Sequence, residues 1–164
     1  SNYPAWRLMQ ALWASDRYNL ARFDCLQPHY SLVHREEFER ELAEVCRTYG
    51  IGVIPYSPLA GGFLTGKYRR GQIPRNSRGY GNDRMRPYLN EQGFAIIDKL
   101  TEIGNRHNAS PAQTAIAWLL ANPTVTSAIV GANSTAQLAD TIKAADVPLT
   151  PEEKAELDNL PSPT

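Results

Sequence analysis

The chain has 164 residues, of which 42 % are hydrophobic and 21 % are charged, so it can bury the core of one folded domain. Lys and Arg together number 17, as do Asp and Glu, and this balance gives no basic excess that would favour a nucleic-acid partner. No apolar run approaches the roughly 18 residues of a membrane span, and residues 1–7 lack the pattern of a signal peptide. We therefore expect a cytoplasmic protein that binds neither nucleic acid nor membrane.

The cysteines and histidines give no sign of a metal site. Cys25 and Cys46 stand in apolar surroundings without metal-ligand spacing, and we expect both to be reduced core residues. His29, His34 and His107 show no metal-binding spacing either. We predict that the protein binds no metal.

The first third of the chain predicts two helices and two strands. Residues 4–18 predict an amphipathic helix whose apolar side chains face a core: Trp6, Leu8, Met9, Leu12 and Trp13. Apolar segments at 21–27 and 52–57 predict strands, the second with the continuous apolar run of a parallel strand that is buried on both faces. Residues 36–49 lie between them and predict a helix that ends at Gly50.

The rest of the chain begins with a long irregular segment. Residues 58–90 show no sustained period, and a loop of such length is usually functional or disordered. Helical spacing resumes at 91–107, and an apolar segment at 125–130 predicts a third strand. The Pro-rich end, 161–164, is expected to fray. Three more helices are predicted from capping patterns at Ser110–Gln113, Ser134–Gln137 and Thr150–Glu153.

Helices and strands alternate along the chain, which predicts an α/β fold with parallel strands. A doubly wound sheet and a (β/α)₈ barrel both fit this order. A barrel needs eight strands and about 250 residues, so a chain with three predicted strands would supply only part of one. In both folds, ligands bind at the carboxyl ends of the strands.

Each predicted strand is followed by groups that suit a ligand, and each has a simpler explanation. Gln27 and Tyr30 suit a flat ring such as nicotinamide, or belong to a Pro-containing turn with a half-buried tyrosine. Glycines at 61–66 suit a phosphate whose charge Lys67 and Arg69 would balance, or form a plain flexible loop. The capped helix after the third strand is an anion site, or simply a capped helix.

Four motifs in this order resemble the aldo-keto reductases, and in particular their bacterial and potassium-channel-β-like members. They are Ser1-Asn2-Tyr3, Gln27-Pro28-His29-Tyr30-Ser31, the segment GVIPYSPLAGG at 52–62, and Ile129-Val130-Gly131-Ala132 with Gln137 following. The resemblance spans essentially the whole chain. It implies that residues 1–164 form the C-terminal half of a (β/α)₈ TIM barrel, strands 6–8 with flanking helices, in which 66–90 is a long loop.

The resemblance also implies a cofactor, NADPH, held without a metal. The cofactor carboxamide would be bound by Ser1, Asn2 and Gln27, and Tyr30 would stack on the nicotinamide face. The pyrophosphate would be lined by Tyr56, Ser57, Leu59 and Gly61, with Leu64 nearby. The adenosine end would meet Gly131, Asn133, Ser134 and Gln137.

Departures from the family pattern limit what the resemblance implies. Asn133 stands where many relatives place an Arg or Ser at the 2′-phosphate, and Thr141 stands where an Asn is common, so NAD stays possible beside NADP. The family's catalytic Asp, Tyr, Lys and His come from its first four strands, whereas this chain starts at the end of the fifth. We therefore assign no catalytic residue and expect the isolated chain to be inactive.

Three functional alternatives follow. The chain is the cofactor-binding half of a reductase of small carbonyl substrates, a non-catalytic dinucleotide-binding or regulatory module like the channel-β relatives, or a half-barrel that binds no cofactor. Open strand edges of an incomplete barrel would favour association. The arginines of the 66–90 loop would cover the cofactor or lie in solvent, and we favour solvent.

Overall fold

The computed structural model describes residues 1–163 except 76, 78–79 and 81–82. Its elements are α1 (Ala5–Tyr18), β1 (Cys25–Leu26), η1 (Phe38–Leu42), α2 (Ala43–Tyr49), β2 (Gly52–Val53), η2 (Ala60–Thr65), η3 (Asp83–Tyr88), α3 (Glu91–Arg106), α4 (Pro111–Leu120), α5 (Thr135–Ile142), η4 (Lys143–Asp146) and α6 (Pro151–Asp158). The element η1 is a π-helical turn, and η2, η3 and η4 are 3₁₀ helices. The fold is α/β, as predicted, around an open parallel sheet of two strands.

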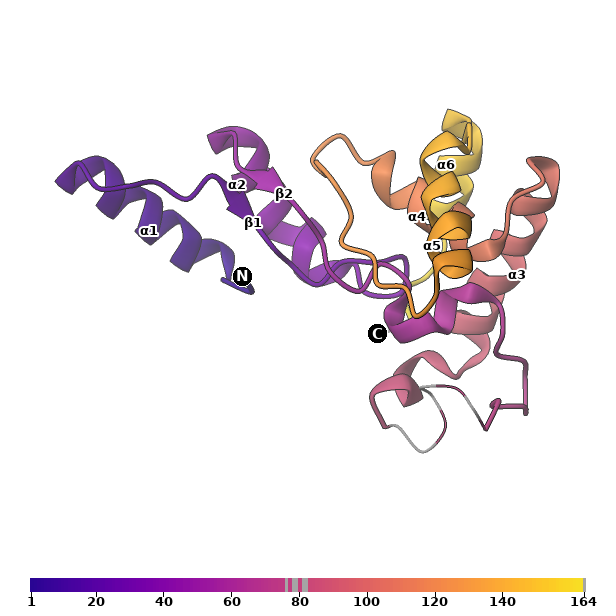
Figure 1. The fold of residues 1–164 in the computed structure, drawn as a ribbon. Coiled ribbons are helices and arrows are strands. Elements are labelled where there is room, and N and C mark those ends of the chain that lie inside the picture. The colour runs from indigo at the N-terminus through magenta and orange to yellow at the C-terminus, as the bar shows by residue number, and fades with distance from the viewer. Residues whose placement is uncertain (76, 78–79, 81–82, 164) are drawn as a thin grey trace.

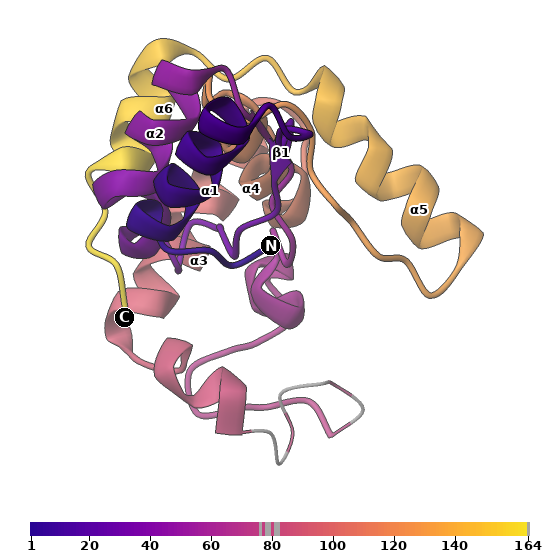
Figure 2. The same cartoon turned by 90° about the vertical axis from the view of Figure 1, so that its left-hand side faces the viewer.

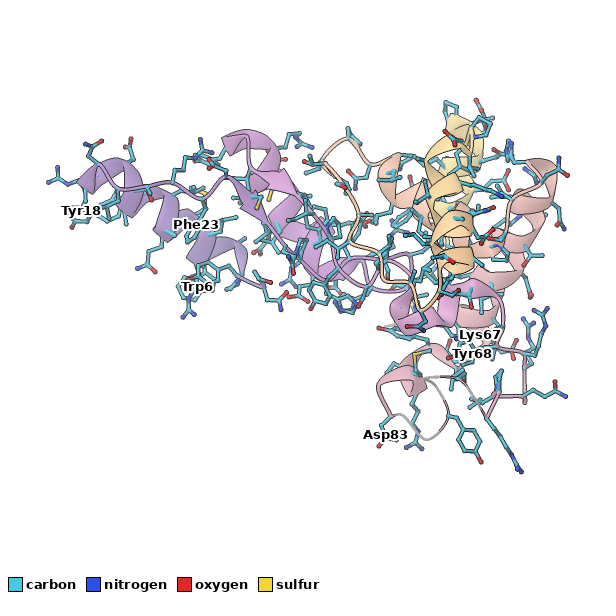
Figure 3. The ribbon with its side chains drawn as sticks, viewed as in Figure 1. Trp6, Tyr18, Phe23, Lys67, Tyr68 and Asp83 are labelled. Carbon is cyan, nitrogen blue, oxygen red and sulfur yellow. The ribbon has the colours of Figure 1, made fainter. Side chains whose placement is uncertain are left out.

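Helix α1 lies at one end of the molecule, far from α3, α4 and α6 at the other end (Figure 1). It buries Leu8 and Leu12 along one narrow stripe. Trp6 and Trp13 were predicted to face the core, but they are 60 % and 59 % exposed. Figure 3 shows Trp6 together with Tyr18 at this outlying end. The amphipathic pattern therefore predicted the helix correctly but overestimated how much of it is covered.

The two strands pair in parallel, with Leu26 beside Val53. A parallel bridge between His29 and Tyr56 continues the same register beyond the strands. The carboxyl ends of β1 and β2 therefore meet at one edge of the sheet, as the predicted β–α units require.

The third predicted strand, 125–130, contributes only isolated bridges. Val125 pairs with Val53 and Ile129 pairs with Tyr56, both in parallel. The ladder is interrupted because the N–H of Val53 donates to the Thr126 hydroxyl (3.2 Å) instead of a backbone carbonyl. This segment still lies next to β2, so its carboxyl end reaches the same sheet edge.

The sheet has one covered face and one open face. Alternate side chains are buried: Leu26, Pro28, Tyr30, Val53 and Pro55. The side chains between them are half-buried or exposed, and we call these positions the open sheet face: Cys25, Gln27, His29, Ile54 and Tyr56. Two predictions are therefore wrong, because the segment 52–57 is not buried on both faces and Cys25 is exposed rather than in the core.

Helix α4 is the centre of the other end of the molecule, where it packs against α3, η2, η4 and α5. The predicted capping boxes form at Ser110 and Thr150, and Ser134 caps α5. Figure 2 shows that α5 projects outwards beyond its contact with α4, and residues 131–140 are all exposed. Among the described residues, no helix combines the length and the apolar composition needed to cross a membrane.

The loop predicted at 66–90 holds more structure than expected. It contains η3, and its buried side chains Tyr68 and Met85 attach it to the core. Arg70 does not simply lie in solvent, because it pairs with Glu91 (3.1 Å) and Asp98 (2.9 Å). Arg78 of the same loop lies outside the described residues.

The helix predicted at 36–49 forms, with η1 as its π-helical part. It ends at Gly50, whose φ of +61° is the left-handed conformation that favours glycine. At the other end of the chain, 161–163 carry no regular structure, and the fraying expected of this tail stays a prediction.

Candidate functional site

The first group of predicted site residues gathers around the backbone carbonyl of Gln27. The hydroxyl of Ser1 donates to this oxygen at 3.0 Å, and the N–H of Asn2 donates to it at 3.3 Å. Asn2 has a φ of +53°, which asparagine adopts more readily than most residues. Ser1, Asn2 and Gln27 are thus brought together at the carboxyl end of β1.

Tyr30 lies on the covered side of the sheet. Its ring is 1 % exposed and packs on Phe38 and Trp118, with centroid distances of 4.7 and 5.4 Å. Its hydroxyl donates to Glu39 at 2.7 Å and accepts from Asn122 at 3.1 Å. Burial, followed by the hydrogen bond to the Glu39 carboxylate, raises the pKa of Tyr30. The ring has no free face, so the structure contradicts the prediction that Tyr30 stacks on nicotinamide.

Tyr56 was predicted to line the pyrophosphate, but it shares the open sheet face with Gln27. It follows β2 on the open sheet face, is half-buried, and stacks on His29 with a centroid distance of 5.1 Å and an interplanar angle of 13°. Gln27, His29 and Tyr56 therefore offer an amide and aromatic rings on one face. The alternation of side chains in a strand gives this result from sequence, because residues 27 and 29 share a face and residue 30 does not.

The ends of β2 and of the segment 125–130 enclose a pocket of about 420 Å³, which we call the strand-end pocket. Its lining is Ser57, Pro58, Leu59, Gly61, Gly62, Thr65, Lys67, Ile129, Val130, Gly131, Ala132, Asn133 and Gln137. Six of the predicted site residues are among them: Ser57, Leu59, Gly61, Gly131, Asn133 and Gln137. In the described part of the chain, no three His, Cys, Asp or Glu side chains are placed to hold a metal ion.

Three residues that were predicted at the pyrophosphate or the adenosine end do not line the strand-end pocket: Tyr56, Leu64 and Ser134. Leu64 is fully buried in the core and does not line the pocket itself, so its predicted place near the pyrophosphate stays a prediction. Ser134 instead acts as the N-cap of α5, where its hydroxyl accepts the N–H of Gln137 at 3.1 Å. The side-chain oxygen of Gln137 in turn accepts the N–H of Asn133 at 2.7 Å. Polar groups at the start of α5 therefore already have partners within the chain.

The wall formed by residues 57–62 has an irregular backbone. The φ angle is positive at Ser57 (56°), Ala60 (48°), Gly61 (66°) and Gly62 (98°). A non-glycine residue in this conformation costs on the order of 1 kcal/mol, and such residues concentrate at binding sites. Backbone N–H groups in turns of this kind form concave surfaces that attract anions.

Lys67 adds a positive charge to this wall. A Cβ on Gly62 would lie 3.1 Å from the Lys67 ammonium nitrogen, so the glycine leaves room for the lysine above the loop. Figure 3 shows Lys67 beside Tyr68 at the end of the molecule below the helices α3 to α6. From the sequence, Lys67 was predicted only as a charge that could balance a phosphate beside the glycine-rich segment, and the family resemblance did not place it at the cofactor.

The chain belongs to the aldo/keto reductase family. The sequence model of the Aldo/keto reductase family matches residues 1–161, which confirms the resemblance found in the motifs. Membership implies a (β/α)₈ barrel as the fold of the family and supports an oxidoreductase.

Relatives span both functions that the motifs suggested. The probable voltage-gated potassium channel subunit beta of Oryza sativa subsp. japonica is 37 % identical over 158 residues, 93 % of this chain and 48 % of that protein. Protein tas of Escherichia coli (strain K12) is 35 % identical, over 96 % of this chain and 45 % of its own. Versiconal hemiacetal acetate reductase of Aspergillus parasiticus is 32 % identical, over 93 % and 44 %. The chain thus spans about half the length of the curated relatives it matches.

Proposed function

We propose that this chain is the cofactor-binding part of an NADPH-dependent oxidoreductase that reduces aldehydes or ketones to alcohols. Membership of the aldo/keto reductase family supports the oxidoreductase class. The observation that carries the cofactor proposal is that the strand-end pocket and the open sheet face lie at the same carboxyl edge of the sheet.

The residues present fit an elongated dinucleotide. The pyrophosphate would lie in the strand-end pocket, against the turns at 57–62 and the Lys67 ammonium. The carboxamide would meet Gln27 and its neighbours Ser1 and Asn2, and the adenosine end would extend towards α5. When bound, the reduced nicotinamide would supply the hydride.

Tyr56 would orient the nicotinamide ring. It is half-buried on the same face as Gln27, so one side chain would stack on the ring while the other would bind its amide. Fixing the ring in this way restricts the face from which the hydride leaves. In this proposal Tyr56 replaces Tyr30, whose ring is enclosed in the core.

We further propose that the open sheet face is the interior of a barrel to which this chain contributes strands 6–8. Barrel interiors are filled by side chains that point inwards from every strand. The half-buried positions at Gln27, His29 and Tyr56 are the ones that further strands would cover. Small carbonyl substrates would then reach the nicotinamide at the carboxyl ends of those strands.

A regulatory dinucleotide-binding module is the second candidate. Two relatives with 37 % and 36 % identity are named as probable voltage-gated potassium channel subunits beta, from rice and Arabidopsis thaliana. Such a module would bind the same cofactor in the same place without necessarily consuming it. Turnover by a barrel that also holds the catalytic residues therefore separates the two candidates, whereas binding does not.

Calorimetric titration of the 164-residue chain with NADPH, and with NADH for comparison, tests the proposal. We expect micromolar binding, about −8 kcal/mol. Replacing Lys67 by Ala should weaken NADPH binding about tenfold, because it removes a charge-assisted contact. Lys143→Ala, at an exposed lysine of η4, is the matched control and should bind as the unsubstituted chain does. No binding of either cofactor would overturn the proposal.

A further inference from the structure

Three aromatic rings form a stack on the open sheet face and the turn that follows it. His29 is the middle ring. The ring of His34 lies 4.0 Å from it at an interplanar angle of 20°, and the ring of Tyr56 lies 5.1 Å from it at 13°. The proposed function uses Tyr56 but gives no role to either histidine.

The backbone holds this stack in place. His29 and Tyr56 are partners in a parallel bridge, so their side chains leave the sheet next to each other on the same side. Ser31 and His34 exchange two backbone hydrogen bonds, of 3.2 and 3.0 Å, and this tight turn folds His34 back over His29. Glu37 lies 3.1 Å from the outer edge of the His34 ring.

The environment favours a neutral ring at the centre of the stack. Burial lowers the pKa of His29 below its ordinary value of 6.5, and the neighbouring His34 lowers it further, whereas Glu37 raises it in part. At neutral pH, His29 is therefore a flat uncharged ring, which stacks on a tyrosine face without importing a charge into the site.

We propose that His29 is a positioning residue, whose ring fixes the plane of the Tyr56 ring so that Tyr56 can stack on the planar ring of a nicotinamide ligand. This inference rests on the proposed function. A tyrosine side chain without a neighbour loses torsional freedom when a ligand binds, and that loss weakens binding. His29 removes part of this freedom before the ligand arrives. His34 packs against His29 and so helps to hold the His29 ring in place.

Two substitutions, one that removes the flat ring and one that keeps it, test the inference. Leu at position 29 has a similar volume to His but no flat face, whereas Phe restores the flat ring without a titrating group. We expect H29L to weaken NADPH binding about three- to tenfold, the value of one aromatic pair, and H29F to bind as tightly as the unsubstituted chain. Thermal unfolding of both variants checks that the fold is retained.

A second measurement observes the stack without any cofactor. In a chain with isotope-labelled tyrosines, the ring-proton resonances of Tyr56 should shift in H29L and should stay close to their original positions in H29F. The enclosed Tyr30 ring is the internal control and should not shift in either variant.

The outcomes separate this inference from the proposed function. If the unsubstituted chain binds neither NADPH nor NADH, the proposed function fails, and the ligand role of His29 fails with it. If the unsubstituted chain binds NADPH and H29L binds it as tightly as H29F does, only the positioning inference is overturned. Unchanged Tyr56 resonances in H29L would overturn it as well.

Discussion

Tyr30 and Tyr56 each follow a strand, but Tyr30 is buried and Tyr56 is only half-buried, so we expect them to have different roles. Tyr30 connects the sheet to the helices through hydrogen bonds to Glu39 and Asn122. Tyr30→Phe should therefore destabilise the fold by about 1 to 3 kcal/mol, because it leaves these two partners without the hydroxyl, and it should not change NADPH affinity. Urea unfolding and a cofactor titration measure the two effects.

Tyr56→Ala should have the opposite pattern of effects on stability and on cofactor affinity. Tyr56 is half-buried on the open sheet face, so its removal should cost less stability than a core aromatic and should weaken NADPH binding. A Tyr30→Phe chain that loses cofactor affinity but keeps its stability would contradict the assignment of both tyrosines.

The two thiols should differ in reactivity. Cys25 is exposed on the open sheet face, whereas Cys46 is 1 % exposed and burial raises its pKa to about 11. A thiol reagent at neutral pH should therefore modify Cys25 rapidly and Cys46 only after unfolding, because the thiolate is the reactive form. Mass spectrometry of the modified chain measures both rates. Equal rates in the folded chain would contradict the different exposure of the two thiols.

At the level of elements, Gly93 fixes how η3 meets α3. A Cβ on Gly93 would lie 2.0 Å from the carbonyl oxygen of Tyr88, a distance that atoms cannot adopt without movement. In an open helix, Gly→Ala stabilises by about 1 kcal/mol. Here we expect Gly93→Ala to destabilise by about 1 to 3 kcal/mol in urea unfolding. Gln92→Ala, at an exposed neighbour in the same helix, is the control and should be close to neutral.

The contact between α3 and α6 should depend on pH. Burial raises the pKa of Glu153, but hydrogen bonds from His107 (2.7 Å) and the N–H of Thr150 (3.1 Å) outweigh burial and place it below its ordinary value of 4.5. A carboxyl group with a lowered pKa contributes full stability above pH 4.5 and loses it as the pH falls through the folded-state pKa.

Glu153→Gln isolates this contribution. Glutamine can still complete the capping box of α6, but it does not titrate. Urea midpoints measured from about pH 6 to about pH 3 should fall more steeply for the unsubstituted chain than for the variant. Equal slopes would show that Glu153 does not contribute to the acid sensitivity of the fold.

Helices that begin with a capping residue were predictable from the sequence. Strands that depend on hydrogen bonds to a distant segment were less predictable. The starts of α4, α5 and α6 follow from the capping residues Ser110, Ser134 and Thr150, because a cap acts within one helical turn. The segment 125–130 does not form a regular strand, because the Thr126 hydroxyl accepts the hydrogen bond that the Val53 N–H would donate in a regular ladder. No local sequence pattern reveals this.

The site shows the same division. The strand-end pocket contains six predicted residues, because parallel strands place their carboxyl ends at the same edge of the sheet. Tyr30 was assigned to the face of Gln27, although the alternation of side chains along a strand places residues 27 and 30 on opposite faces. The burial of Leu64 depends on the packing of η2 against α4, a contact between segments distant in sequence.

For the whole molecule, the open sheet face and the short parallel edges predict association. Unpaired strand edges and partly exposed apolar side chains bind other chains readily. We expect the 164-residue chain to show concentration-dependent association in sedimentation, and Cys25 to become protected from thiol reagents as the associated fraction grows. A chain that stays monomeric at all concentrations, with Cys25 fully reactive, would contradict this expectation.

We propose that the ends of β1, β2 and the segment 125–130 together bind a nicotinamide dinucleotide. Addition of NADPH to the nitrogen-labelled chain, followed by the backbone amide resonances, tests it most directly. We expect shifts at Gln27, Tyr56, Gly61 and Gly131, with no shift at Ala155 in α6. Absent shifts, or shifts confined to α1 or α6, would contradict it.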